Sequence, residues 1–127
     1  MATTTVTTEN FEQTVTENDI VFMDFWAGWC GPCRMFAPVY EKVSETYPEM
    51  VFGKVDTEAE QGIAQQAQIT SIPTLMAFRE GILVFRQAGA MNAQGFTELV
   101  EAVKGLDMDD VRRQLAEAQA NEAKQQS

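Results

Sequence analysis

The sequence is organised around one stretch, Phe22–Met23–Asp24–Phe25–Trp26–Ala27–Gly28–Trp29–Cys30–Gly31–Pro32–Cys33. Its first half is typical of a buried apolar strand, and Gly31–Pro32 marks a turn with a cysteine on each side. Cys30 and Cys33 are the only cysteines in the sequence. Because the two thiols lie three positions apart at the start of a helix, they are within bridging distance and can cycle between dithiol and disulfide.

The segments on both sides of this stretch alternate between strand and helix patterns. Strands are expected at residues 3–6, 20–26, 50–56, 75–79 and 83–88. Helices are expected at residues 9–15, 33–47, 57–67 and 93–103, with Thr8 capping the first and Asn92 the last. This order, β-α-β-α-β-α-β-β-α, predicts an α/β fold in which helices flank a mixed central sheet, with a parallel portion and an antiparallel hairpin.

The character of the sequence changes near residue 106. Residues 1–106 carry the apolar periodicity of one folded domain, whereas residues 107–127 are polar and rich in Gln, Ala and Glu. Asp107 or Asp109 could cap a helix there, but its apolar stripe is narrow. We therefore expect a C-terminal extension that is a short helix or disordered.

Charge and composition exclude several classes of function. A formal charge of −10 disfavours nucleic acid and anionic lipid as partners, and the chain has no His, the commonest general base and metal ligand. Two thiols do not supply the four ligands of a structural zinc site, unless two chains share the metal. No leader pattern or membrane-length apolar run is found. We expect a cytoplasmic monomer with no bound metal.

The two cysteines are expected to play different roles. The nucleophile in thiol–disulfide exchange is the thiolate, and a helix N-terminus favours an anion. Cys30 lies at that terminus, and Cys33 lies one turn further, where it can attack a mixed disulfide formed by Cys30. No His lies between them, which disfavours a strongly oxidising pair.

The octapeptide from Trp26 to Cys33 resembles the active-site signature of the thioredoxin family. Further positions fall where the pattern of that family places them, namely Asp24, Pro38, Lys54, Ile72–Pro73–Thr74, Gly81 and Gly89–Ala90. The resemblance covers residues 5–106 and implies the thioredoxin fold. Gly28, Arg34 and Ala67 depart from the commonest pattern, which affects loop stiffness, local charge and packing rather than the reaction.

The resemblance implies four catalytic residues: Cys30 as nucleophile, Cys33 as resolving thiol, Asp24 and Lys54. Asp24 is an acid in an otherwise apolar strand, so burial should raise its pKa and let it accept the Cys33 proton through water. The alternative is an acid at the end of a strand that points to solvent. Lys54 interrupts the neighbouring strand and either pairs with Asp24 or extends its amine to the surface.

The resemblance also implies a substrate-binding patch. It predicts a cis Ile72–Pro73 bond beside the cysteines, which leaves the Ile72 backbone available to an extended substrate segment. The residues expected in this patch are Trp29, Gly31, Pro32, Ile72, Pro73, Gly89 and Ala90. Such an apolar surface suits many protein disulfides.

The function that the resemblance implies is reduction of protein disulfides, as part of cell redox homeostasis, with no bound cofactor. Electrons would come from a thioredoxin reductase, an NADPH-dependent flavoprotein. Two alternatives remain open from the sequence. One is an oxidase or isomerase of exported proteins, and the other is a binding module in which the thiols are secondary.

Overall fold

A five-stranded mixed sheet forms the centre of the protein. The structure is a computed structural model that describes residues 2–126. The strands are β1 (Thr3–Thr5), β2 (Ile20–Trp26), β3 (Val51–Asp56), β4 (Thr74–Arg79) and β5 (Ile82–Ala88). In space their order is β1-β3-β2-β4-β5. The strands β1, β3 and β2 run parallel to one another, whereas β4 runs antiparallel to both of its neighbours, β2 and β5. The sheet is therefore mixed, with an antiparallel hairpin, as predicted.

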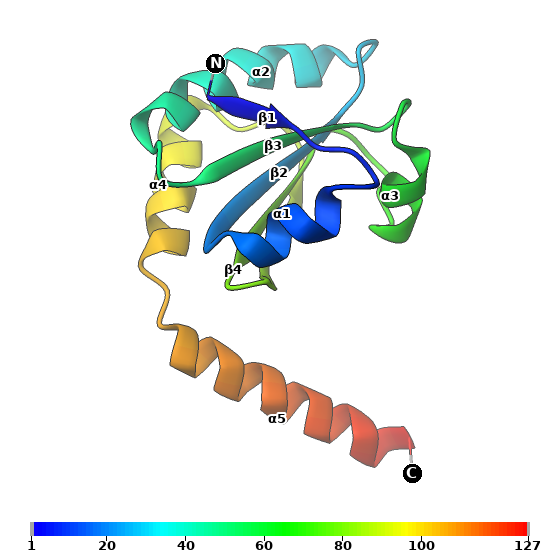
Figure 1. The fold of residues 1–127 in the computed structure, drawn as a ribbon, viewed down its shortest axis with the longest axis vertical. Helices are drawn as coiled ribbons and strands as arrows, with labels where there is room; N and C mark the ends of the chain where they lie inside the picture. Colours follow the sequence, from blue (N-terminus) through cyan, green and yellow to red (C-terminus); the bar gives the residue numbers. More distant parts are fainter. Residues whose placement is uncertain (1, 127) are drawn as a thin grey trace.

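Helices cover both faces of this sheet (Figure 1). The helices on the sheet are α1 (Phe11–Glu17), α2 (Gly31–Thr46), α3 (Gln61–Gln66) and α4 (Ala93–Lys104), and a fifth helix, α5 (Met108–Gln126), extends away from it. Side chains alternate between the two faces of the sheet along a strand, and each face has its own core. Phe22 of β2 lies in the core under α2 and α4, whereas Val21 and Phe25 lie in the core under α1 and α3. Asp24 lies two residues after Phe22, so its side chain lies on the same face of the sheet, the face that α2 covers.

Two helices begin later than the sequence predicts. The prediction that Thr8 caps the first helix is wrong, because its hydroxyl accepts the Ile63 N–H (3.3 Å) and its own N–H donates to Glu60 (2.8 Å). These bonds tie the chain before α1 to α3, and α1 starts only at Phe11. The start of α3 is delayed because the Asp56 carboxylate accepts the Glu58 N–H (2.9 Å) in a local turn.

The β4–β5 hairpin closes through Glu80 and Gly81, whose φ angles of 51° and 80° are those of a two-residue primed turn. Next to this turn, the buried Arg79 guanidinium donates to the Val103 carbonyl (2.7 Å) and the Lys104 carbonyl (3.1 Å). The side chain thus satisfies carbonyls at the end of α4 that have no partner inside the helix. The hairpin and α4 are held together by this contact.

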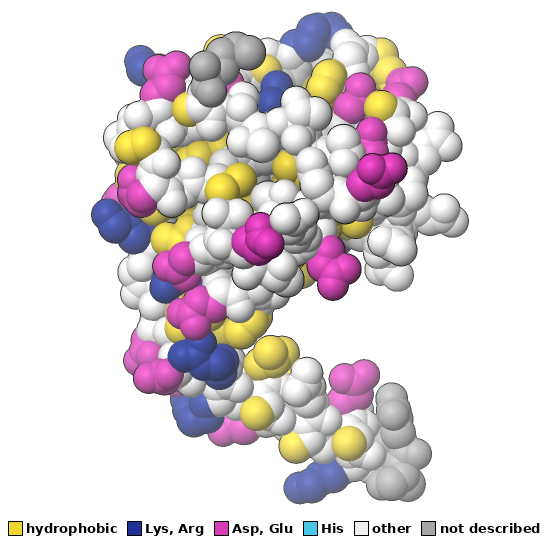
Figure 2. Space-filling model, in the orientation of Figure 1, with side chains coloured by type: hydrophobic (Ala, Val, Ile, Leu, Met, Phe, Trp, Pro, Cys, Tyr) yellow, Lys and Arg dark blue, Asp and Glu magenta, His cyan; other side chains and the backbone are white. Residues whose placement is uncertain are grey.

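The C-terminal extension is a continuous helix, α5, longer than the marginal helix expected. The Asp107 carboxylate caps it by accepting the Asp110 N–H (3.2 Å), Met108 is buried, and Arg112 pairs with Glu80 in the hairpin turn. Beyond this contact α5 projects from the domain, and Figure 2 shows a hollow between the two. Within residues 2–126, no helix has the length and apolarity of a membrane span.

Candidate active site

The two cysteines lie where β2 passes into α2. Cys30 is the N-cap residue of α2, and the Cys33 N–H donates to its Sγ at 3.2 Å. The two sulfurs form a disulfide, with the Cα atoms 5.2 Å apart. Because unpaired N–H groups at a helix start stabilise an anion, Cys30 occupies the position expected of the nucleophile.

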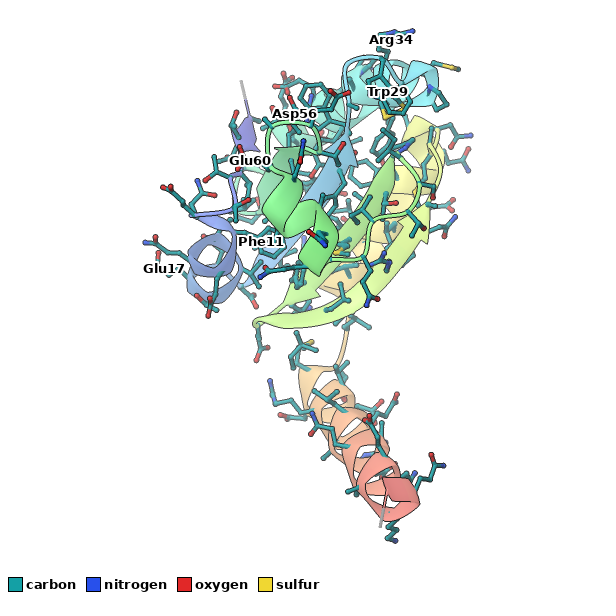
Figure 3. The ribbon with its side chains drawn as sticks, turned by 90° about the vertical axis from the view of Figure 1, so that its right-hand side faces the viewer. Phe11, Glu17, Trp29, Arg34, Asp56 and Glu60 are labelled. Atoms are coloured by element: carbon teal, nitrogen blue, oxygen red, sulfur yellow. A yellow bond between two sulfur atoms is a disulfide. The ribbon has the colours of Figure 1, made fainter. Side chains whose placement is uncertain are left out.

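Arg34 fixes the loop that precedes α2. Its Nη1 donates to the Gly28 carbonyl at 2.9 Å, so the guanidinium folds back over the loop that carries Trp29. Figure 3 shows Arg34 and Trp29 at the same end of the molecule. The sequence marks Arg34 only as a departure from the family pattern, and this contact gives it a structural role.

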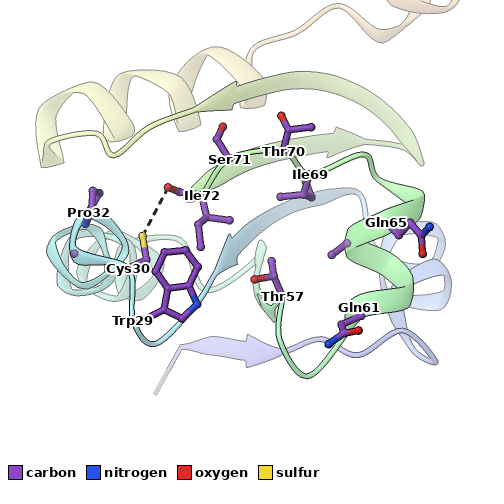
Figure 4. A pocket seen from close by; sticks show the side chains of 12 residues that line it. Trp29, Cys30, Pro32, Thr57, Gln61, Gln65, Ile69, Thr70, Ser71 and Ile72 are labelled. Carbon is purple, nitrogen blue, oxygen red and sulfur yellow. Dashed lines mark hydrogen bonds between the residues drawn. The ribbon is translucent and has the colours of Figure 1, made fainter.

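A groove with a volume of about 720 Å³ starts at Cys30 and extends to α3 (Figure 4). None of its lining residues is charged, although the protein carries a formal charge of −10. The lining consists of Trp29, Cys30, Gly31, Pro32, Thr57, Gln61, Ala64, Gln65, Ile69, Thr70, Ser71 and Ile72. Cys30 Sγ lies 3.7 Å from the Ile72 carbonyl oxygen, and the Ile72–Pro73 bond is cis, as predicted.

The groove brings together four of the residues predicted to bind substrate, Trp29, Gly31, Pro32 and Ile72. The other three, Pro73, Gly89 and Ala90, do not line it, but the Gly89 N–H donates to the Pro73 carbonyl (2.8 Å) beside it. Sequence reasoning missed the far end of the groove on and after α3. Apart from Ile69, its residues are small or polar, and together they form no motif, so no signal in the sequence could identify them.

Asp24 is buried in β2, on the side of the sheet that α2 covers, with an exposed fraction of 1%. Its Oδ1 has no hydrogen-bond partner among the described residues. Burial raises the pKa of Asp24 from 3.8 to about 7, and the charge of Lys54 acts in the opposite direction. The carboxyl can therefore gain or lose a proton near neutral pH, and the alternative of a solvent-facing acid is wrong.

Lys54 lies directly opposite Asp24 in the β2–β3 register. No ion pair joins these two described residues; instead, Lys54 Nζ lies 5.1 Å from the centre of the Trp26 ring. The side chain is half-buried and contributes to a polar pocket of about 270 Å³. Lys54 thus influences Asp24 through its charge rather than through a direct contact.

Among residues 2–126, no cluster of three or more His, Cys, Asp or Glu side chains is arranged to hold a metal ion. The chemistry that the site can perform lies in its two sulfurs and in the buried Asp24. A sulfur that lines the groove, a second sulfur bonded to it and a buried acid that can take up a proton suit thiol–disulfide exchange.

Comparisons with known proteins agree with this chemistry. The sequence model of the thioredoxin family matches residues 2–102. The chain is 54% identical over 119 residues to "Putative thioredoxin 2" of Streptomyces coelicolor, an alignment that covers 94% of this chain and 89% of that protein. It is 39% identical over 90 residues to "Thioredoxin-1" of Saccharomyces cerevisiae, covering 71% and 87%.

Solved structures give the same result. A structure of Plasmodium falciparum thioredoxin matches with a TM-score of 0.72 and 38% identity, covering 77% of this chain and 96% of that one. The thioredoxin of Malassezia sympodialis matches with a TM-score of 0.69 and 33% identity, covering 80% and 88%. The Streptomyces alignment reaches into α5, whereas the family model ends before it.

Proposed function

The chain belongs to the thioredoxin family of thiol–disulfide oxidoreductases, and we propose that it reduces disulfides of other proteins with Cys30 as the nucleophile. One observation carries this proposal above all. Cys30 is both the N-cap of α2 and part of the lining of the groove, whereas Cys33 does not line the groove. The sulfur that the helix activates is therefore the one that a substrate can reach.

The reaction proceeds in two exchanges. The Cys30 thiolate attacks one sulfur of the substrate disulfide, which forms a mixed disulfide and releases the other substrate sulfur as a thiolate. Cys33 then gives its proton to Asp24 through water and attacks Cys30 Sγ. The second substrate thiolate leaves, and the Cys30–Cys33 disulfide forms. Two electrons have passed from the dithiol to the substrate.

The groove provides the binding surface for the substrate chain. Trp29, 68% exposed at its rim, offers an apolar ring, and the Ile72 carbonyl lies beside the reacting sulfur. An extended segment around the substrate cysteine would contact the backbone near Ile72 and Pro73, with Gly31, Pro32, Gly89 and Ala90 around it. Because the groove lining is uncharged, it suits disulfides in segments of varied sequence.

Several further features belong to the same proposal. No bound cofactor is required, since the two sulfurs carry the electrons, and a thioredoxin reductase, an NADPH-dependent flavoprotein, would return them. The acidic charge disfavours nucleic acid as a partner. The protein would act as a cytoplasmic monomer, with residues 1–106 as the catalytic domain and residues 107–127 as a separate extension.

Reduction of insulin disulfides, followed by precipitation of the released B chain, tests the proposal. The reduced wild-type protein should catalyse the reaction and Cys30→Ser should abolish it, with Glu45→Gln on the exposed side of α2 as a matched control. Equilibration with glutathione should give a potential near the ~−270 mV typical of thioredoxins. A potential near −120 mV would indicate an oxidase. Full biological function in a Cys30→Ser, Cys33→Ser double variant would indicate a binding module.

A further inference from the structure

The polar pocket beside Lys54 is not explained by the reaction described above. It lies between β1, β3 and α2, and Thr3, Thr5, Trp26, Glu41, Lys54 and Asp56 line it. We call it the Lys54 pocket. The pocket is distinct from the substrate groove, with which it shares no residue.

Glu41 is the residue of the pocket that ties two elements together. Its Oε1 accepts the Ala2 N–H at 3.0 Å, and its Oε2 accepts the Thr3 hydroxyl at 2.6 Å. These two bonds attach the edge strand β1 to α2. The bond from Thr3 contributes most to lowering the pKa of Glu41, and the charge of Lys54 lowers it further. Glu41 is therefore ionised at neutral pH, and it is a second carboxylate that acts on Lys54.

The charges that face Asp24 explain why this matters. Lys54 lies opposite it on β3, with Asp56 two residues beyond; from α2, Tyr40 and Cys33 face the same side. The Tyr40 hydroxyl donates to the Gly53 carbonyl (2.8 Å). On β4 the residue paired with Asp24 is Leu75, and on β1 the residue paired with Lys54 is Thr5, so neither strand adds a charge.

Lys54 thus lies between Asp24 in the interior and Glu41 at the edge of the sheet. Asp56 is a third carboxylate in the pocket, and it accepts two backbone N–H groups of the turn that follows β3. We propose that Glu41 is a positioning residue for the exchange reaction: it shares the charge of Lys54 and holds that amine at the pocket, so that Asp24 remains a base suited to the Cys33 proton. The inference rests on the role of Asp24 given under the proposed function.

The position of Lys54 affects how strongly Asp24 acts as a base. A direct ion pair with Lys54 would stabilise the Asp24 carboxylate and make it a weaker proton acceptor. A general base is most effective when its pKa lies near the working pH. No ion pair joins the described side chains of Glu41 and Lys54, which line the same pocket, so Glu41 acts on the amine through its charge. That charge favours the position of the amine at the pocket over a pairing with Asp24, and it also disfavours ionisation of Asp24. Both effects act in the same direction.

The test measures the titration of Asp24 directly, by carbon NMR of its carboxyl group in the full-length disulfide form, in which the cysteines do not titrate. In Glu41→Gln the amide can keep both bonds to β1, because its oxygen accepts the Ala2 N–H and its nitrogen donates to the Thr3 hydroxyl. Only the charge is lost. We expect the titration midpoint of Asp24 to fall by roughly half a unit, the size of one charge acting at intermediate distance.

Three further variants separate charge from structure. Thr3→Val removes one bond to β1 but keeps the charge of Glu41, and Glu45→Gln removes a charge one turn further along α2; both should leave the midpoint of Asp24 unchanged. In a Lys54→Met background, Glu41→Gln should shift Asp24 less than in the wild type, because the shared cation is absent. The pH profile of Cys33 resolution in the reduced protein should follow the same shift.

The proposal is overturned if Glu41→Gln leaves the midpoint of Asp24 in place or raises it. It is also overturned if Thr3→Val or Glu45→Gln gives the same fall, or if the Lys54→Met background changes nothing. These outcomes are independent of the proposed function, which fails instead if Cys30→Ser still reduces insulin. The role of Asp24 as acceptor of the Cys33 proton fails if Asp24→Asn leaves the rate of Cys33 resolution unchanged.

Discussion

The outer and inner sides of the Cys30–Cys33 pair differ in every physical property that matters for exchange. On the outer side, Cys30 opens onto an uncharged groove with the exposed ring of Trp29 at its rim. On the inner side, Cys33 is buried on the face of α2 that covers the sheet, and Asp24 of β2, paired in register with Lys54, lies on the same side of the sheet. Cys30, on the side where a substrate binds, and Cys33, on the side of the proposed proton acceptor, are therefore separated by one turn of α2.

The difference shows how one helix start can serve two opposite requirements. A nucleophile needs access to its substrate and stabilisation of its anion, which the N-cap position gives to Cys30. A base for neutral pH needs an anion that is disfavoured, which burial gives to Asp24 by raising its pKa to about 7. The start of α2 therefore combines access from the groove on one side with desolvation of an acid on the other.

The largest effect should come from replacing each of the two cysteines separately by serine. Cys30→Ser and Cys33→Ser should each abolish turnover, but only Cys33→Ser should accumulate a covalent complex, because Cys30 can still attack and nothing resolves the product. Non-reducing electrophoresis with an oxidised protein substrate would detect this complex. A complex trapped instead by Cys30→Ser would reverse the assignment of outer and inner sides.

The next effect concerns the buried acid. Asp24→Asn should slow resolution by Cys33 about tenfold or more at neutral pH, since the proton acceptor is lost. Stopped-flow measurement of substrate release from the mixed disulfide would record the change. Attack by Cys30 on the outer side should be affected much less, and an equal loss in both steps would contradict the separation of roles.

The same variant should be more stable than the wild type at high pH. The pKa of Asp24 is about 7 in the folded protein and 3.8 in the unfolded chain, so the folded state holds a proton that the unfolded state has lost. Wild-type stability should therefore fall as pH rises from 3.8 to about 7, by up to roughly 4 kcal/mol, and then level off. Asp24→Asn should remove this slope in urea unfolding at several pH values. An unchanged slope would show that another group causes it.

A smaller effect is expected on the outer side. Trp29→Ala should raise KM for a protein disulfide by about five- to tenfold, through loss of an exposed aromatic contact. A small aromatic disulfide that does not fill the groove should react nearly as fast as with the wild type. Trp29→Phe keeps a ring and should recover most of the binding. A change in the titration of Asp24 would show that the two sides are not independent.

The smallest effect should come from removing residues 107–127. The extension contacts the domain at Met108 and Arg112, at the hairpin turn. We expect less than a twofold change in insulin reduction, with a modest loss of thermal stability from the exposure of Met108 and the broken pair with Glu80. A large loss of turnover would show that α5 contributes to the catalytic domain.

Much of the fold follows from local patterns in the sequence. The apolar run before Cys30 and the alternation of strand and helix predict the mixed sheet and its helices, and Asn92 caps α4 as expected by accepting the Gly95 N–H at 2.8 Å. Gly31–Pro32, expected as a turn, instead forms the first two residues of α2. The boundaries of α1 and α3 were less accurate. Thr8 has the chemistry of a cap, but its hydroxyl bonds to a residue 55 positions away, which no local pattern reveals.

The sequence alone indicates redox chemistry, because two cysteines three positions apart before a helix are within bridging distance, and it singles out Asp24 because an acid in an apolar strand conflicts with its surroundings. Tertiary structure alone decided the rest. It placed Lys54 over Trp26 without an ion pair to Asp24, brought Glu41 of α2 to the edge strand, and set the uncharged residues of α3 at the far end of the groove. These arrangements depend on contacts between segments distant in the chain, whereas patterns in a sequence report mainly on neighbours within it.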